Sequence, residues 1–275
     1  QLDIYRSFFI EQRSSFIFND NIQHNLFMLR KIANHPFLIQ SEFKKFKKEA
    51  KSEEEEAEMI VNYSGKMIVL DKLLAKFQTM KNRVLILSNM KEMVNLIELY
   101  LQKKHYTYKR LDGSNGEINN SQFQNGDFIF LSSISNFKYD YSETDTAIIY
   151  DSHFTPVSLF DKKVYRIFTR GTIEEDLFNK FIIEKDFSAQ SKEDINFLMR
   201  KNAYFAFCGQ IDQSFFSEPI EKTIDYRTDF NLESPEELVD RDFWINLFKK
   251  LDLKKLEDIS MDVDQLRSIA RSIIN

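Results

Sequence analysis

The chain has 275 residues, of which 43% are hydrophobic and 29% are charged, as is typical of a soluble globular protein. Only six glycines are present, which argues against a glycine-rich phosphate loop. The single cysteine, Cys208, excludes an internal disulfide framework and suits a reducing compartment. The net charge of −5 argues against tight binding of the whole chain to bare nucleic acid, although a local basic patch can still bind phosphate. No apolar run reaches the roughly 18 residues of a membrane span, and because the sequence begins at Gln1 we expect it to be part of a longer protein.

Residues 2–39 have the apolar spacing of helices, which ends at Asn34-His35-Pro36 because a proline keeps the preceding residue out of the α region. A charge-dense segment follows from Glu42 to Glu58, with lysines first and glutamates after them. Such blocks are typical of a solvated, mobile linker, and a contact with histones or DNA is the alternative. Ser64 is then expected to cap the next helix.

The stretch from Arg83 to Ser114 predicts a strand, a helix and a second strand. The apolar run Val84–Leu87 is long enough for a strand that is buried on both faces. Asn89 is expected to cap the following helix, because Glu92 lies three residues later in the spacing of a capping box. A strand, helix and strand within about thirty residues form a βαβ unit with parallel strands.

Further strands extend this unit into an α/β layer with a mostly parallel sheet flanked by helices. Thr172 and Glu175 predict a capping box for the helix after the last strand. Strand signals end at Phe187, so we expect an all-helical C-terminal segment, with helices beginning near Ser191 and Ser234. The additional strands are predicted at 128–131, 147–150 and 164–168.

Two motifs resemble parts of nucleotide sites but are incomplete. Ser64-Gly65-Lys66 lacks both the earlier glycine and the following Ser or Thr of a phosphate loop. Asp151 follows an apolar strand like the first carboxylate of an ATPase metal site, but Ser152 stands where the second carboxylate is needed.

Asp112 and Asp151 both follow strands, at the edge where α/β sheets bind ligands, and loop capping is the favoured interpretation of both. The four histidines and Cys208 share no metal-ligand spacing, and no serine or cysteine nucleophile has a base beside it. We therefore predict no catalytic residue and no metal site.

Several sequence blocks occur in a fixed order along the chain. They are Leu29–Ile39, Ser64–Met67, Leu70–Leu74, Arg83–Ser114, Phe128–Ser132, Asp145–Ser152, Val164–Arg166, Thr169–Glu175 and, in the tail, Ser191–Ile195, Arg200–Tyr204 and Asp242–Trp244. Over roughly residues 2–186 these blocks resemble the second RecA-like motor lobe of SWI/SNF-type ATPases. The tail is similar to the segment that follows the motor in chromodomain-helicase-DNA-binding (CHD) chromatin remodellers. The resemblance implies three parts: a helical lead-in and charged linker at 1–63, a degenerate RecA-like helicase C-terminal lobe at 64–186, and a helical post-motor segment at 187–275.

The same resemblance implies ATP-dependent nucleosome remodelling in the nucleus. Its partners would be a first motor lobe, nucleosomal DNA, histones and other remodeller subunits, with no membrane. ATP and Mg²⁺ serve this family and are held mainly by the first lobe, which this sequence does not contain, so we expect no cofactor in this chain.

The departures from the family pattern concern catalysis. The loop that should carry an arginine and two glycines is replaced by Leu131–Phe137. The arginine-finger block, expected between Asp161 and Lys162, is missing, and such arginines contribute about 10³–10⁵ in rate in related chemistry. Arg166 and Arg170 belong to a later strand and loop and are not taken as replacements.

Polar residues at three loops match family positions near the DNA backbone, where they would position the duplex without reading its sequence. Helix capping and turn formation explain the same residues equally well. The predicted DNA-binding residues are Ser88, Asn89, Lys91, Asp112, Gly113, Ser114, Ser132 and Ser133.

The first hypothesis is therefore the second motor lobe of a CHD-like remodeller that hydrolyses no ATP on its own. The alternative is a non-catalytic pseudo-helicase module that binds chromatin or a remodeller subunit.

Overall fold

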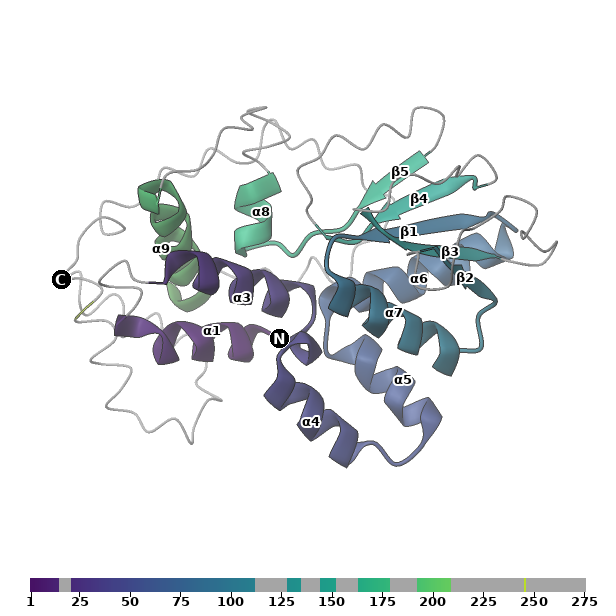
Figure 1. The fold of residues 1–275 in the computed structure, drawn as a ribbon, viewed down its shortest axis with the longest axis horizontal. Helices are drawn as coiled ribbons and strands as arrows, with labels where there is room; N and C mark the ends of the chain where they lie inside the picture. Colours follow the sequence, from purple (N-terminus) through teal and green to yellow (C-terminus); the bar gives the residue numbers. More distant parts are fainter. Residues whose placement is uncertain are drawn as a thin grey trace. The chain divides into compact units, whose positions relative to one another are not determined.

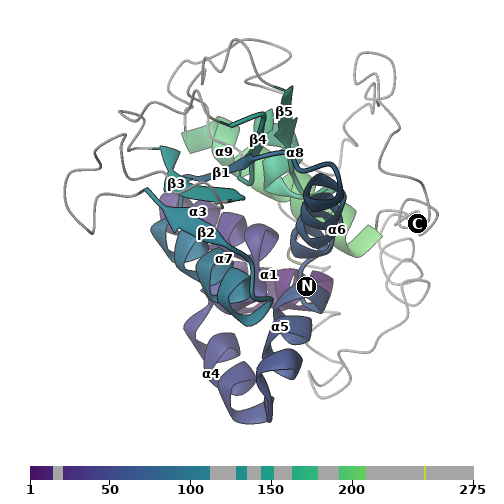
Figure 2. The ribbon, with the colours of Figure 1, turned by 90° about the vertical axis from the view of Figure 1, so that its right-hand side faces the viewer.

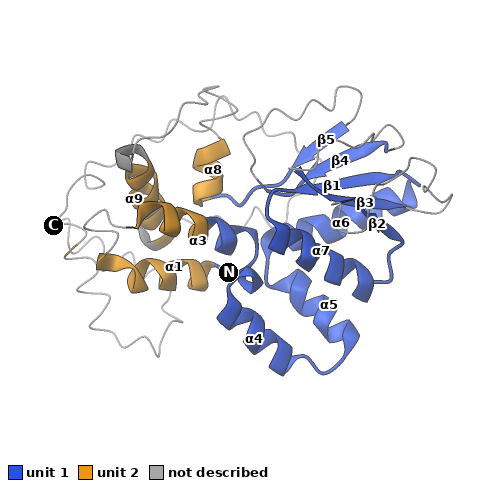
Figure 3. Ribbon diagram, viewed as in Figure 1, with its two compact units in different colours: residues 1, 30–170 blue, residues 2–29, 171–275 orange. Residues whose placement is uncertain are grey.

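The computed structural model describes residues 1–14, 21–111, 128–134, 144–151, 163–178, 192–208 and 245 (Figure 1). The chain forms two compact units (Figure 3). The first comprises residue 1 and residues 30–170, and the second comprises residues 2–29 and 171–275. The boundaries predicted from the sequence at 63/64 and 186/187 stay predictions. Within the described ranges, no helix combines the length and apolarity that crossing a membrane requires.

The first unit is built on a parallel sheet of five strands, in the order β2-β3-β1-β4-β5. This confirms the predicted fold class and each predicted strand. Leu87 is the Cα partner of both Ser132 and Ile149, and Ile149 is in turn the partner of Arg166. The strands are β1 (Val84–Ser88), β2 (Tyr108–Arg110), β3 (Ile129–Ser133), β4 (Thr146–Ile149) and β5 (Lys163–Arg166).

Helices cover one face of this sheet. Figures 1 and 2 both show α6 and α7 on the same side of the strands. The helices and the 3₁₀ turn that lie wholly or partly in this unit are α3 (Ile22–Asn34, which the two units share), η1 (Pro36–Leu38), α4 (Gln40–Glu49), α5 (Glu53–Asn62), α6 (Gly65–Thr79) and α7 (Lys91–Lys103).

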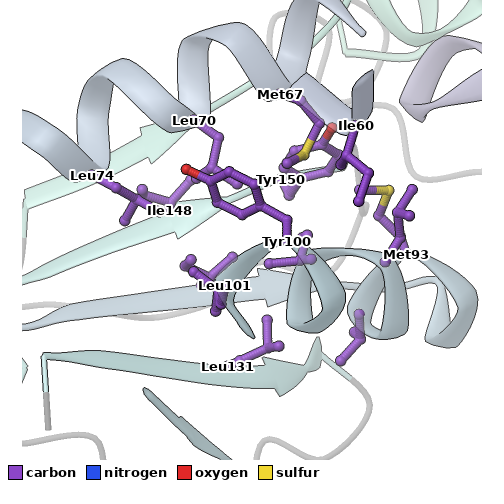
Figure 4. Close-up of a cluster of buried hydrophobic side chains, with 14 of the residues drawn as sticks. Ile60, Met67, Leu70, Leu74, Met93, Tyr100, Leu101, Leu131, Ile148 and Tyr150 are labelled. Atoms are coloured by element: carbon purple, nitrogen blue, oxygen red, sulfur yellow. The ribbon is translucent and has the colours of Figure 1, made fainter. Parts of the chain in front are cut away.

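The main core lies between α6, α7 and the helical face of the sheet (Figure 4). Side chains alternate between the two faces along each strand, so Ile86 and Ile148 join this core while Leu87 and Ile149 join a second cluster on the other face. Fully buried Leu and Ile side chains of this kind each contribute about 1.5–3 kcal/mol. The side chains labelled in Figure 4 are Ile60, Met67, Leu70, Leu74, Met93, Tyr100, Leu101, Leu131, Ile148 and Tyr150.

The charge-dense segment 42–58, which we expected to be a mobile linker, instead forms most of α4 and α5. Both helices are amphipathic. The Phe46 ring of α4 stacks on Phe37 with centroids 4.4 Å apart, and Lys47 pairs with Glu56 of α5 at 3.1 Å. The prediction was wrong because the density of charges hid a narrow apolar stripe that is buried against the core.

The second unit contains α1 (Leu2–Glu11), α8 (Ile173–Phe178) and α9 (Lys192–Cys208). The Tyr5 hydroxyl accepts a hydrogen bond from the Ile173 amide at 3.1 Å, and the Arg6 guanidinium donates to the Ala206 carbonyl at 2.7 Å. Asp176 of α8 binds Lys201 of α9 at 2.7 Å. Helix α9 begins where the sequence predicts, and apart from residue 245 the helices predicted beyond residue 208 lie outside the described residues.

The predicted capping box at α8 forms in a shifted pattern. The Thr172 hydroxyl accepts from the Glu174 amide at 3.3 Å rather than from that of Glu175, and the Glu175 carboxylate accepts from the Gly171 amide at 2.7 Å. Gly171 has a φ of +69°, a conformation that glycine adopts without strain.

Candidate nucleic-acid interface

The candidate site lies at the carboxyl edge of the parallel sheet, where β1 and β4 end. In open α/β sheets, ligands bind outside this edge. Two sequence-predicted features meet here: the turn from β1 into α7, with Ser88, Asn89 and Lys91, and Asp151 just after β4.

Asp151 holds the β1–α7 turn in place. Its carboxylate accepts hydrogen bonds from the Ser88 hydroxyl at 2.7 Å, the Asn89 amide at 2.8 Å and the Met90 amide at 3.3 Å. The carboxylate is buried, so these donors replace the water that would otherwise solvate it. The interpretation of Asp151 as a loop-capping group is thereby confirmed.

Asn89 does not cap α7. The helix begins at Lys91 with Met90 as its N-cap residue, and no side-chain cap bond forms there. The physical reason is that Asp151, from a neighbouring strand, supplies the acceptor that a local cap would provide. A tertiary contact of this kind overrides the local capping pattern.

Lys66, from the motif that resembles a phosphate loop, is turned into the protein. Its ammonium donates to the Asn34 side-chain oxygen at 2.7 Å and to the Tyr150 carbonyl at 2.9 Å, and lies 5.1 Å from the Tyr150 ring centroid. Ser64 caps α6 as predicted, through the Met67 amide. The motif therefore joins α6 to the end of α3 and to Tyr150, the residue after β4.

His35 completes the buried polar junction beside Lys66. Its Nδ1 accepts from the Phe37 amide at 3.0 Å, so its Nε2 carries the proton and donates to the Ile60 carbonyl at 2.8 Å. Burial is the main cause that lowers the pKa of His35 to about 4, so the ring is neutral at pH 7. Sequence reasoning saw only a helix end at this motif and missed the role of His35.

The structure brings together only part of the predicted DNA-binding set. Ser88, Asn89 and Lys91 share one turn, in which Ser88 is buried and Lys91 is exposed. Ser132 is buried in β3 with its hydroxyl donating to the Leu111 carbonyl at 3.1 Å, and Ser133 is also buried. Asp112, Gly113 and Ser114 lie outside the described residues. DNA binding by these residues stays a prediction.

The chemistry open to this edge is electrostatic. Lys91 carries a positive charge at the N-terminus of α7, where the helix dipole also favours anions. Among the residues that the structure describes, no group of three or more His, Cys, Asp or Glu side chains is arranged to hold a metal ion. The described part of the edge suits phosphate contacts better than acid–base catalysis.

By sequence, the chain matches one family model and several curated proteins. The model of a family described as class II histone deacetylase complex subunits 2 and 3 matches residues 3–212. Chromodomain-helicase-DNA-binding protein 6 of Rattus norvegicus is 28% identical over 282 residues, which cover 83% of this chain and 10% of that relative. Chromodomain-helicase-DNA-binding protein 7 of Homo sapiens is 28% identical over 256 residues, covering 76% of this chain and 8% of the relative. The chain thus spans about a tenth of the length of these relatives.

Solved structures show the same fold. The C-terminal domain of the Sulfolobus solfataricus SWI2/SNF2 ATPase matches with a TM-score of 0.51 and 19% identity, over 75% of this chain and 94% of that one. A chain from the yeast class II Hda1 histone deacetylase complex matches with a TM-score of 0.55 and 15% identity, over 73% and 75% of the two chains. The resemblance to a second RecA-like motor lobe is confirmed, and the chain belongs to the family of class II histone deacetylase complex subunits 2 and 3.

Proposed function

We propose that this chain is a non-catalytic derivative of a second motor lobe that acts as a chromatin-binding subunit of a class II histone deacetylase complex, in the nucleus. The observation that carries the proposal is the match of residues 3–212 to the family of class II histone deacetylase complex subunits 2 and 3. The internal hydrogen bonds of Asp151 and Lys66 support its non-catalytic part. Both groups lie at or beside the sheet edge that faces ligands in α/β proteins, and both are bonded to the protein itself.

Phosphoryl transfer needs metal-binding carboxylates, a residue that positions the nucleophile and cations on the transferred phosphate. The Asp151 carboxylate is occupied by one hydroxyl and two amides, so it does not fit a Mg²⁺ ligand or a general base. The arginine-finger block is missing from the sequence. Because the resemblance assigns Mg²⁺ and ATP mainly to a first lobe, the missing arginine-finger block is the stronger argument that this chain does not catalyse phosphoryl transfer.

The same turn is suited to a passive contact with DNA. Asp151 holds Ser88, Asn89 and the start of α7 rigid, and Lys91 extends from this turn with its side chain exposed. A lysine near a helix N-terminus binds a backbone phosphate without reading bases. A rigid lobe that contacts phosphates would place the other subunits of a complex on chromatin.

The subunit role is tested by purifying the full-length protein, with an affinity tag, from its native source. We expect a class II histone deacetylase catalytic subunit to co-purify in a fixed ratio that persists after nuclease treatment, since protein contacts would hold the complex together. Recovery without any deacetylase would contradict the proposal.

A second candidate is the second lobe of an ATP-dependent remodeller, which works with a first motor lobe on nucleosomal DNA and histones. The 28% identity to CHD-type relatives favours it. DNA-stimulated ATP hydrolysis by the full-length protein would support this candidate and contradict the first, whereas co-purification with a deacetylase and no hydrolysis would contradict the second.

A further inference from the structure

Arg166 is the last residue of the edge strand β5, at the carboxyl edge of the sheet. It is aligned with Ile149, and through Ile149 with Leu87, on the face of the sheet opposite α6 and α7. The neighbouring Tyr165 points to the helical face, where its ring lies 5.4 Å from that of Phe77. The alternation along β5 therefore directs Arg166 away from the helices.

Arg166 differs from the other arginines that the structure describes. Each of those has a polar, ionic or ring partner, such as the Ala206 carbonyl for Arg6 and Glu98 for Arg110. Within the described residues, Arg166 is half-buried and has no acceptor for any of its five N–H donors. Burial lowers the pKa of this guanidinium, but an arginine keeps its charge.

Because Arg166 is only half-buried and no described residue accepts from it, its N–H donors are open to a ligand that supplies oxygens. We propose that Arg166 binds a phosphate group at the carboxyl edge of the sheet. The planar guanidinium matches two phosphate oxygens at once, and the position is the one where parallel α/β sheets bind ligands. This phosphate belongs either to the DNA backbone or to a nucleotide. For DNA, the inference rests on the proposed function, in which Lys91, beyond the same edge, contacts the DNA backbone.

Stability separates a ligand-binding arginine from a structural one. In Arg166→Met the apolar stem is kept and the unpartnered charge is removed, so the midpoint of urea unfolding should stay level or rise. Lys163→Gln is the matched control, because Lys163 lies on the same strand, is exposed, and is roughly 10 Å away at 3.3 Å per residue. A clear fall of the midpoint in Arg166→Met alone would show a structural role and overturn the proposal.

Binding is measured on the full-length protein with two probes: a fluorescent 30-base-pair DNA duplex and a fluorescent ATP analogue, each across a salt series. For the probe that supplies the phosphate, Arg166→Met should weaken binding about tenfold at low salt, as expected for one charge-assisted hydrogen-bonded contact. If that probe is DNA, the slope of log K against log [salt] should also fall by about 0.9. Arg166→Lys should keep the slope and lose only part of the affinity, while Lys163→Gln leaves both unchanged.

The binding measurements identify the source of the phosphate or overturn the proposal. A loss confined to DNA assigns the phosphate to the duplex backbone, and a loss confined to the ATP analogue assigns it to a nucleotide. Unchanged binding of both probes by Arg166→Met, or no binding of either probe by the wild type, overturns the proposal, and a carboxylate of a protein partner then becomes the candidate acceptor. If Arg166→Met leaves binding unchanged while Lys91→Gln weakens DNA binding as predicted, the Arg166 proposal is wrong but the proposed DNA contact of Lys91 stands. The two proposals can therefore fail independently.

Discussion

Replacing His35 by glutamine should reduce the loss of folding free energy that the first unit shows as the pH falls below 6.5. His35 is fully buried, and its ring is held neutral between the Phe37 amide and the Ile60 carbonyl. Burial is the largest cause that lowers its pKa to about 4; the bond to Ile60 opposes the shift, and the N-terminal amino group adds to it. The unfolded chain, with a pKa near 6.5, binds this proton more readily than the folded one.

The direction and size of the change in folding stability follow from this difference in pKa. Because the folded pKa is lowered, stability is fully present above pH 6.5 and is lost as the pH falls toward 4. The whole shift corresponds to about 3 kcal/mol, of which about 2 kcal/mol is already lost at pH 5. Carboxylates also titrate in this range, so only the difference between wild type and His35→Gln isolates the histidine.

The assay is urea unfolding at pH 7.5, 6.0 and 5.0, followed by circular dichroism. We expect wild type to lose about 2 kcal/mol more than His35→Gln between pH 7.5 and 5.0. His24→Gln, at an exposed position of α3, is the matched control and should follow the wild-type profile. Parallel profiles for wild type and His35→Gln would refute the reasoning.

Three further substitutions test the carboxyl edge. Asp151→Ala should destabilise the fold by about 3 kcal/mol in urea unfolding, because it leaves buried donors without an acceptor. Asp145→Ala, at an exposed position, should cost less than half as much. Equal costs would contradict the role of Asp151 in holding the β1–α7 turn. Lys66→Met should cost about 1–3 kcal/mol in the same assay, because two buried oxygens lose their donor. In addition, 5 mM ATP with Mg²⁺ should not raise the melting temperature of wild type more than that of the variant. A rise in wild type alone would show that Lys66 holds a nucleotide. Lys91→Gln should lower the slope of log K for DNA binding against log [salt] by about 0.9, whereas Lys44→Gln, on the exposed face of α4, should leave this slope unchanged. A lower slope in Lys44→Gln but not in Lys91→Gln would show that the β1–α7 turn does not contact DNA.

The sheet could be predicted because strands buried on both faces consist of continuous apolar runs. Val84–Leu87 is such a run, and its place before an amphipathic helix specifies a parallel crossover. The charged helices α4 and α5 could not be predicted in the same way. Their stability depends on burying a few side chains such as Phe46 and Ile60 against distant elements, and the local charges do not show this.

In the candidate site, too, local sequence predicts some features, and others depend on distant contacts. The position of Asp151 after a strand was enough to predict a loop-capping role. The partners of Lys66 are 32 and 84 residues away along the chain, so local sequence gives no sign that its ammonium is buried. The local spacing of Asn89 predicts a helix cap, and only the approach of Asp151, just after β4, changes its role. The lack of a partner for Arg166 among the described residues likewise depends on contacts between distant parts of the chain, which local sequence does not show.

The most direct test of the central claim is an ATPase measurement on the full-length protein purified from its native source, with and without nucleosomal DNA. The account predicts that hydrolysis stays at the background of a buffer control and does not rise with DNA, while deacetylase activity accompanies the chain. DNA-stimulated hydrolysis that co-elutes with this chain through two purification steps would contradict the account and establish an active motor.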